Sequence, residues 1–427
     1  MIWVVFVVLA LALVMGIPVG FSIGISSMVY ILVNGRIPVV MMAQRMVSTL
    51  QSFPYLALPL FILSGALMMY GSTPRIMNLA NYLLRKKRWG MGYAGIIGSA
   101  AFGTISGSGA ATTAAIGGVV VPEMVKQGYR KGFVAPLLGA AGTLGGVIPP
   151  SVAFVVYAQV SGVSIADMFM AGIIPGILTA ILMCILTRYM VIKNNWGENN
   201  TEKYANITKA EKRKLWLDAI PPLLMPVMIL GGVMSGIVTA TEAAAVAVVY
   251  AIILSTLVYK ELSFKELLNV LKKTAISSAT ILLIIGMAGP FAWILTYENV
   301  TSNLANWVIN FSSSIVVVYG MVLLIQLILG TFMETLSIVL ITTPIFLPVL
   351  MQYGVDPVAY GIASGLVLCV GCITPPLAVT LFVGCNIVNA RIEETVNDTV
   401  KIGLVMLVAT LLVCVFPQLA TFLPSIM

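Results

Sequence analysis

Long apolar stretches alternate with short clusters of basic residues along most of this chain. The clusters lie at Arg75, Arg85 to Arg88, Lys126 to Lys131, Arg188 to Lys214 and Lys260 to Lys273, and no Lys or Arg occurs between Lys273 and Arg391. Membrane proteins keep positively charged loops on the cytoplasmic side, so the clusters predict cytoplasmic loops and the apolar stretches predict membrane helices. We expect helices at 133–160, 165–190, 215–235, 239–259, 274–297, 359–388 and 400–424.

The first 33 residues form one apolar run with no charge before Arg36. This run is too long for the core of a signal peptide. We interpret it as the first membrane helix, kinked at Gly16-Ile17-Pro18. Counting the crossings between basic clusters then places the N-terminus in the cytoplasm and the C-terminus in the periplasm.

Two further apolar blocks are too short for a pair of full membrane spans, which needs about 40 residues. The first block, about 92–127, joins two basic clusters and is interrupted at Ser106-Gly107-Ser108-Gly109. The second, about 315–350, is broken near Gly330-Thr331 and has no basic flank. We predict two re-entrant helical hairpins, one entering from the cytoplasm and the other from the periplasm.

The two halves of the chain also share short motifs. Gly103-Thr104 matches Gly330-Thr331 at an offset of 227 positions, and residues 145–150 match residues 371–376 at an offset of 226. Because these matches keep their order while the predicted membrane orientation reverses, they indicate an inverted-topology repeat.

The expected fold is therefore an all-α polytopic membrane protein with two hairpins and two broken helices. We assign 1–190 to the first repeat, 191–235 to a cytoplasmic linker and a connecting helix, and 236–427 to the second repeat. A weaker match between Gly16-Ile17 and Gly236-Ile237, at an offset of 220, supports this division.

Composition narrows the possible functions. The chain has 427 residues, of which 60% are hydrophobic and 9% charged, and this balance excludes a soluble globular domain. It has no histidine and no Gly-Lys dipeptide, so histidine–metal sites and a Walker A loop are excluded. No paired catalytic carboxylates or nucleophile–base pair is evident, so we expect no enzyme and no cofactor. We interpret the net charge of +8 as basic cytoplasmic loops rather than nucleic-acid binding.

The proline pairs Pro149-Pro150 and Pro375-Pro376 should break their helices, because each proline lacks an amide donor. Carbonyl groups one turn earlier then lose their helical partners and could ligate a hard cation such as sodium. The N-termini of the half-helices at the hairpin tips would direct partial positive charge at a carboxylate substrate. An inverted repeat with broken helices is the layout of a secondary transporter.

Several polar residues fall at these breaks. Ser106 and Ser108 lie at the first hairpin tip, where close packing of small residues is the alternative to ion or substrate binding. Ser151 and Thr374 place hydroxyl groups at the two helix breaks. Glu334 is the only charged residue between Glu298 and Asp356 and is a candidate for the ion and substrate site. A structural hydrogen bond at the hairpin turn is the alternative for Glu334.

Several motifs together resemble the large membrane (M, DctM-like) subunit of the tripartite ATP-independent periplasmic (TRAP) transporters, over essentially the whole chain. These motifs are residues 58–65, Ser106 to Ala115, Gly145 to Pro150, residues 171–176, residues 241–245, Gly330 to Glu334, residues 343–348 and Thr374 to Pro376.

The resemblance implies sodium-coupled import of an organic carboxylate, such as a sialic acid or a C4-dicarboxylate, across the bacterial inner membrane. It further implies an elevator movement, a periplasmic substrate-binding protein and a small four-helix membrane subunit, which we expect as a separate chain. The implied sodium ligands are Ser106, Gly107, Gly145 and Ile148 at the first site, and Gly330, Glu334, Gly371 and Thr374 at the second. The implied substrate contacts are Ser106, Ser108, Ser151 and Glu334. A stand-alone ion-coupled carboxylate transporter and a proton or sodium antiporter remain the alternatives.

Overall fold

The computed structural model describes residues 2–198 and 207–426, and throughout these ranges it contains helices and loops without a β-strand. The first half comprises α1 (Trp3–Val14), α2 (Val19–Asn34), α3 (Val40–Leu50), η1 (Phe53–Leu56), α4 (Ala57–Met68), α5 (Ser72–Leu84), α6 (Gly90–Ser106), α7 (Gly109–Lys126), α8 (Lys131–Thr143), η2 (Leu144–Gly146), α9 (Val152–Ser161) and α10 (Ile165–Lys193).

The second half comprises α11 (Lys209–Met234), α12 (Ala240–Ile253), η4 (Leu254–Val258), α13 (Phe264–Tyr297), α14 (Val300–Phe311), α15 (Ile315–Gly330), α16 (Thr335–Gln352), α17 (Pro357–Gly371), α18 (Val379–Val388), η5 (Ile392–Glu394), α19 (Val396–Val415), α20 (Gln418–Thr421) and η6 (Pro424–Ile426). The element η4 is a π-helical turn that continues α12. The chain is thus all-α, as the sequence predicts.

Helix length and composition agree with a multi-pass membrane protein. Six helices of the described ranges are long and apolar enough to cross a bilayer. A seventh span results if 40–50 and 53–68, which are bent by 68° relative to each other, are counted together. Many large apolar side chains on these helices face outward, as lipid contact requires.

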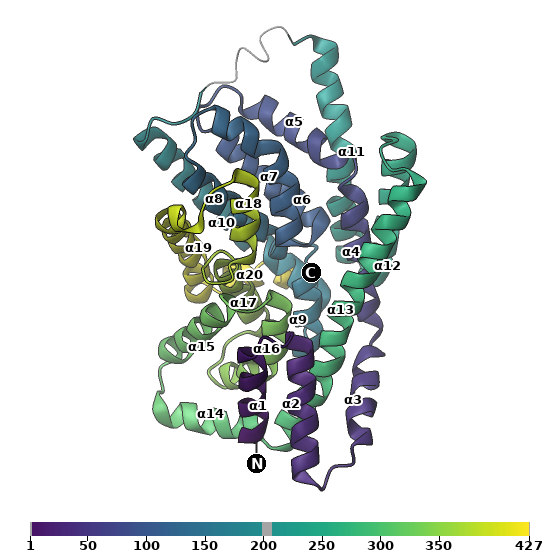
Figure 1. The fold of residues 1–427 in the computed structure, drawn as a ribbon, viewed down its shortest axis with the longest axis vertical. Helices are drawn as coiled ribbons and strands as arrows, with labels where there is room; N and C mark the ends of the chain where they lie inside the picture. Colours follow the sequence, from purple (N-terminus) through teal and green to yellow (C-terminus); the bar gives the residue numbers. More distant parts are fainter. Residues whose placement is uncertain (1, 199–206, 427) are drawn as a thin grey trace.

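The two halves place equivalent helices at opposite ends of the molecule (Figure 1). The hairpin of α6 and α7 enters from the end at which α5 lies, and the hairpin of α15 and α16 enters from the end at which α14 lies. The first broken helix consists of α8, η2 and α9, and the second consists of α17 and α18. Both predicted hairpins and both predicted helix breaks are therefore present in inverted arrangement.

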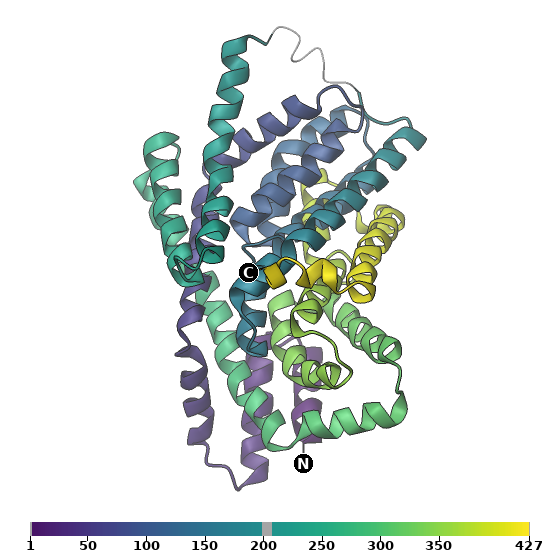
Figure 2. The same ribbon diagram turned by 180° about the vertical axis from the view of Figure 1, so that it is seen from behind.

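The halves interlock around the breaks. Helix α18, which follows the second break, packs against α7 and α8 of the first half. Helix α9, which follows the first break, packs against α16 of the second hairpin. A bundle of α2, α3, α4, α11, α12 and α13 lies beside this assembly and contacts it through α4 and α13 (Figure 2). Helices α5 and α14 lie across the two ends and lead from the bundle to the hairpins.

The prediction of a single kinked first helix is wrong. Helices α1 and α2 are separate and pack side by side, with a turn at Gly16, which has φ of +77° (Figure 1). The turn at Gly236, with φ of +68°, similarly joins α11 to α12. The helical pair α1–α2 therefore resembles the pair α11–α12.

This correction changes the expected position of the N-terminus. The N-terminus lies at the same end as the loop between α2 and α3, opposite the loop between α5 and α6 with its basic cluster (Figure 1). A cytoplasmic N-terminus is therefore not supported. The C-terminal elements α20 and η6 pack against α10. The proposed domain boundaries stay predictions, and the linker residues 199–206 lie outside the described ranges.

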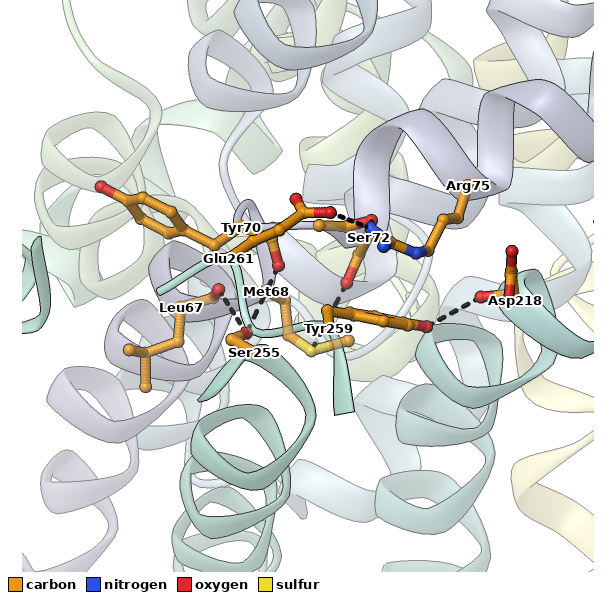
Figure 3. Close-up of polar contacts among 10 residues, drawn as sticks. Leu67, Met68, Tyr70, Ser72, Arg75, Asp218, Ser255, Tyr259 and Glu261 are labelled. Atoms are coloured by element: carbon orange, nitrogen blue, oxygen red, sulfur yellow. Dashed lines mark hydrogen bonds and ion pairs between the residues drawn. The ribbon is translucent and has the colours of Figure 1, made fainter. Parts of the chain in front are cut away.

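A polar junction fixes the turn between α4 and α5 to the bundle (Figure 3). The Arg75 guanidinium lies 2.7 Å from the Glu261 carboxylate and 3.8 Å from the ring centroid of Tyr259. The buried Ser255 hydroxyl, in the π-helical turn, donates to the carbonyl oxygen of Leu67 at 3.0 Å. Because Ser255, Tyr259 and Glu261 come from the second half, this junction joins the two repeats at the start of α5.

Candidate functional site

The first hairpin tip is a tight turn between α6 and α7. Gly107 ends α6 in the left-handed conformation, with φ of +61°. The hydroxyl groups of Ser106 and Thr112 lie 2.6 Å apart, so the two legs of the hairpin are joined directly below the tip. Ser108 is the N-cap of α7 and accepts a long hydrogen bond of 3.5 Å from the amide of Ala111. The positive end of the α7 dipole therefore lies at this tip.

The first helix break lies beside this tip. The peptide bond between Pro149 and Pro150 is cis, and Ser151 caps α9 through a 3.4 Å bond from the amide of Phe154. The Ser151 hydroxyl is fully buried and donates to the Gly146 carbonyl oxygen at 2.7 Å. Ser151 therefore closes the break internally in this conformation.

The second tip is bonded directly to the second break. The Leu377 amide, which directly follows the second proline pair, donates to the Thr331 carbonyl oxygen at the tip at 3.0 Å. The Thr335 hydroxyl lies 3.4 Å from the sulfur of Cys372. The Thr374 hydroxyl, in the break after α17, donates to the carbonyl oxygen of Val370 near the end of that helix, at 2.7 Å. Tip and break are thus held together by backbone and side-chain bonds.

Glycine permits the same close backbone approach in both repeats. A Cβ atom added to Gly103 would lie 2.5 Å from the Cα atom of Gly145, and one added to Gly145 would lie 2.6 Å from that of Gly103. A Cβ added to Gly371 would lie 2.7 Å from the Cα of Gly330. These glycines belong to the motifs that revealed the repeat, and their shared role is to let each hairpin contact its broken helix.

The two tip–break pairs also meet each other. A Cβ atom on Gly109, at the start of α7, would lie 3.3 Å from the methyl group of Thr380 on α18. The Thr380 hydroxyl donates to the carbonyl oxygen of Cys372 in the second break, at 3.0 Å. The thiol of Cys369 donates to the carbonyl oxygen of Thr143, just before the first break, at 3.4 Å. The residues of both predicted sites therefore form one central region.

The predicted site residues differ in whether their polar groups are already hydrogen-bonded or are exposed at the tips. The hydroxyl groups of Ser106, Ser151 and Thr374 all take part in internal hydrogen bonds. Ser108 and Glu334 are exposed at the two tips. The Glu334 carboxylate has no hydrogen-bond or ion-pair partner within 2–198 and 207–426, so the structural alternative of a hydrogen bond at the turn finds no support. Their functional roles stay predictions.

The expected loss of helical partners before each proline pair is partly compensated. The carbonyl oxygen of Gly146 accepts from Ser151, and that of Cys372 accepts from the amide and hydroxyl of Thr380, at 3.2 and 3.0 Å. A carbonyl oxygen has two lone pairs, so the single bond to Gly146 leaves capacity for a cation, whereas the two bonds from Thr380 occupy the carbonyl oxygen of Cys372.

The ligand atoms that this region offers suit a hard cation rather than a transition metal. No cluster of three His, Cys, Asp or Glu side chains that could hold a metal ion occurs in the described part of the chain. The site instead offers carbonyl, hydroxyl and carboxylate oxygen atoms, which are ligands of hard cations.

Two features of the structure were not identified from the sequence, one in this region and one at the start of α19. Thr112 and Thr380 belong to stretches rich in small or apolar residues, and only the fold shows which carbonyl or hydroxyl each one meets. Asp398 at the start of α19 is fully buried between Arg130 and Lys401, with the lysine 2.9 Å away. Lys401 could be predicted as a partner of Asp398 because it is three residues away in the sequence. Arg130 could not, because it lies in the other repeat.

Comparison with known proteins decides the family. The sequence profile described as tripartite ATP-independent periplasmic transporter, DctM component, matches residues 6–419. The chain belongs to this family. The DctM family comprises transporter permeases and not enzymes, so the resemblance noted from the motifs is confirmed.

Individual relatives cover nearly the whole chain. The C4-dicarboxylate TRAP transporter large permease protein DctM of Rhodobacter capsulatus is 33% identical over 99% of both chains. The sialic acid TRAP transporter large permease protein SiaM of Vibrio cholerae is 32% identical over 96% of this chain and 95% of its own. The isethionate TRAP transporter permease protein DctMQ of Oleidesulfovibrio alaskensis is 36% identical over 97% of this chain, which spans 65% of that protein.

Among solved structures, the YdaH transporter of Alcanivorax borkumensis resembles this DctM-family chain with a TM-score of 0.57. The sequence identity is 15%, and the match covers 88% of each chain. At this identity the likeness concerns the fold alone.

Proposed function

We propose that this DctM-family permease imports an organic carboxylate across the bacterial inner membrane, driven by sodium. The observation that carries the proposal is the paired construction of the centre. Two hairpin tips and two helix breaks bring carbonyl and hydroxyl oxygen atoms together, beside the exposed carboxylate of Glu334. Such oxygen atoms suit a sodium ion.

The substrate class is supported by the relatives and by the charge of the site. Relatives carry names that specify C4-dicarboxylate and sialic acid, which are carboxylates, and isethionate, which is a sulfonate, so all three are organic anions. No Lys or Arg lies between Lys273 and Arg391, so recognition of an anion would rest on helix N-termini, hydroxyl groups and bound cations.

We further propose an elevator movement in which the hairpins and broken helices move against the bundle of α2, α3, α4, α11, α12 and α13. Helices α5 and α14 lead from the bundle to the hairpins, and α4 and α13 of the bundle contact the hairpins through α6 and α16 (Figures 1 and 2). The working partners would be a small four-helix membrane subunit and a periplasmic substrate-binding protein.

Uptake by proteoliposomes tests this function. The chain would be reconstituted with its small subunit, supplied with its binding protein, and tested against a panel of C4-dicarboxylates and sialic acids. We expect uptake only with an inward sodium gradient and only with the binding protein present. Uptake by the chain alone would favour the stand-alone transporter, and uptake driven by a proton gradient without sodium would favour proton coupling.

A further inference from the structure

The loop that follows each hairpin is tied to the loop that precedes it. Tyr129 follows α7, and its hydroxyl donates to the carbonyl oxygen of Arg88, between α5 and α6, at 2.8 Å. Tyr353 follows α16, and its hydroxyl donates to the carbonyl oxygen of Ser312, between α14 and α15, also at 2.8 Å. Each tyrosine therefore bridges the two legs of its hairpin at the base, far from the tip.

These two hydrogen bonds are related by the repeat. Tyr129 and Tyr353 are 224 positions apart, and so are Arg88 and Ser312. Donor type, acceptor type, bond length and sequence offset all agree, although the two hairpins enter from opposite ends. Two unrelated loop contacts would not be expected to share all four properties.

The surroundings of Tyr129 hold its hydroxyl in place. The side chain is 2% exposed, and its ring lies 6.4 Å from that of Trp196. Burial raises the pKa of the Tyr129 hydroxyl, which keeps it protonated as a donor. Arg88 is itself held, because its guanidinium donates to the carbonyl oxygens of Gly197 at 3.0 Å and Asn195 at 3.1 Å.

The first ends of α5 and α14 both lie against the bundle. Arg75 at the start of α5 pairs with Glu261 (Figure 3). Glu298, the C-cap of α13 two residues before α14, accepts a hydrogen bond from the hydroxyl of Tyr30 on α2, and Asn34 donates to the same hydroxyl at 3.0 Å. Each transverse helix is therefore attached to the bundle at its first end and to the base of a hairpin at its second end.

We propose that Tyr129 and Tyr353 are positioning residues that close the bases of the two hairpins, so that each hairpin moves as one unit with its transverse helix during transport. This inference rests on the proposed elevator movement. Neither tyrosine touches the central region. Without the hydroxyl, the two legs of a hairpin can separate at the base, and movement of the transverse helix is no longer passed fully to the tip.

The test compares Tyr→Phe variants in the complete transporter in lipid nanodiscs and in proteoliposomes. Tyr129→Phe and Tyr353→Phe remove one oxygen atom each and keep the ring. The matched control is Tyr250→Phe, because the Tyr250 hydroxyl donates to the carbonyl oxygen of Pro221 at 2.7 Å within the bundle. All three variants therefore lose the same kind of bond.

Hydrogen exchange measured by mass spectrometry reports on the loops at each hairpin base. We expect amide exchange about 2- to 10-fold faster at the first base in Tyr129→Phe and at the second base in Tyr353→Phe, the range set by one hydrogen bond. In both variants the maximal uptake rate should fall while sodium still raises thermal stability as in the unmodified protein. Tyr250→Phe should change neither base nor the uptake rate.

Unchanged exchange at the hairpin bases would overturn the proposal, as would faster exchange with full uptake. An equal loss of uptake in Tyr250→Phe would show a general stability effect and would also overturn it. If the unmodified transporter shows no sodium-dependent uptake, the proposed function fails. The exchange data then decide separately whether the two tyrosines close the hairpins.

Discussion

Replacing Gly103 by alanine should disturb the contact between the first hairpin and the first helix break. The added Cβ atom would lie 2.5 Å from the Cα atom and 2.8 Å from the amide nitrogen of Gly145. Carbon atoms in contact normally lie about 3.5–4.0 Å apart. The obstacle is backbone rather than a flexible side chain, so α6 and the break must separate by about 1 Å.

The expected loss of stability in Gly103→Ala is estimated by comparison with Gly118→Ala, in the middle of α7. A Cβ atom on Gly118 would meet nothing within 4 Å. Both substitutions gain up to about 1 kcal/mol from the higher helix propensity of alanine. Only Gly103→Ala adds the cost of overpacking, which is about 1–3 kcal/mol. We therefore expect Gly103→Ala to be less stable than Gly118→Ala by about 1–3 kcal/mol.

Thermal unfolding of the purified variants in detergent, followed by tryptophan fluorescence, measures this difference. Gly371→Ala, with 2.7 Å to the Cα atom of Gly330, should behave like Gly103→Ala. Sodium-dependent uptake should also fall in both tight variants, because the carbonyl groups of the break move with the backbone. A Gly103→Ala protein as stable and as active as Gly118→Ala would refute the close-contact argument.

Two further substitutions test ion pairs that join the repeats. Arg130→Met leaves the buried Asp398 carboxylate with Lys401 alone and should destabilise the protein by about 1.5–3 kcal/mol, the value of one hydrogen bond to a charged group. Adding Asp398→Leu should restore much of the thermal midpoint, and a double variant no better than the single one would contradict this. Arg75→Ala removes a partly exposed ion pair with Glu261 and a cation–π contact, which together should lower the free energy of unfolding by about 1–2 kcal/mol. Arg75→Lys should lose less stability, because the charge remains. Equal losses of stability for the two variants in a denaturation series would contradict the role of the ion pair.

The repeat could be predicted because its signals are local. Glycine at 103 and 330 and the proline pairs at 149–150 and 375–376 each act on their own helix, through size or a missing amide. Their effect therefore depends little on distant residues, and the hairpins and breaks were found where these signals lie.

The first helix shows where local signals are ambiguous. A turn between two membrane helices usually brings polar residues, but the turn at Gly16 lies inside an unbroken apolar run. Gly16 and Pro18 suit both a kink and a turn, and the packing of α1 against α2 decides between them.

The sequence does not show which distant residues contact each other in the fold. Tyr129 and Tyr353 stand in similar settings, Gln127-Gly128-Tyr129 and Gln352-Tyr353-Gly354, but the order of the last two residues is exchanged. Their offset of 224 also differs from those of the tips and breaks. Only the folded hairpins show that both hydroxyl groups meet equivalent carbonyl oxygens.

The most direct test of the account is whether sodium stabilises the protein specifically. Thermal stability of the chain with its small subunit would be compared in sodium chloride and choline chloride at matched ionic strength. A ligand bound only to the folded state adds about 2.7 kcal/mol at 100 times its dissociation constant. We expect a saturable rise with sodium that Glu334→Gln weakens and that Glu242→Gln, in the Thr239–Glu242 capping box of α12, leaves intact. Equal stability in the two salts, or a sodium effect unchanged in Glu334→Gln, would contradict the assignment of sodium sites to the hairpin tips and helix breaks.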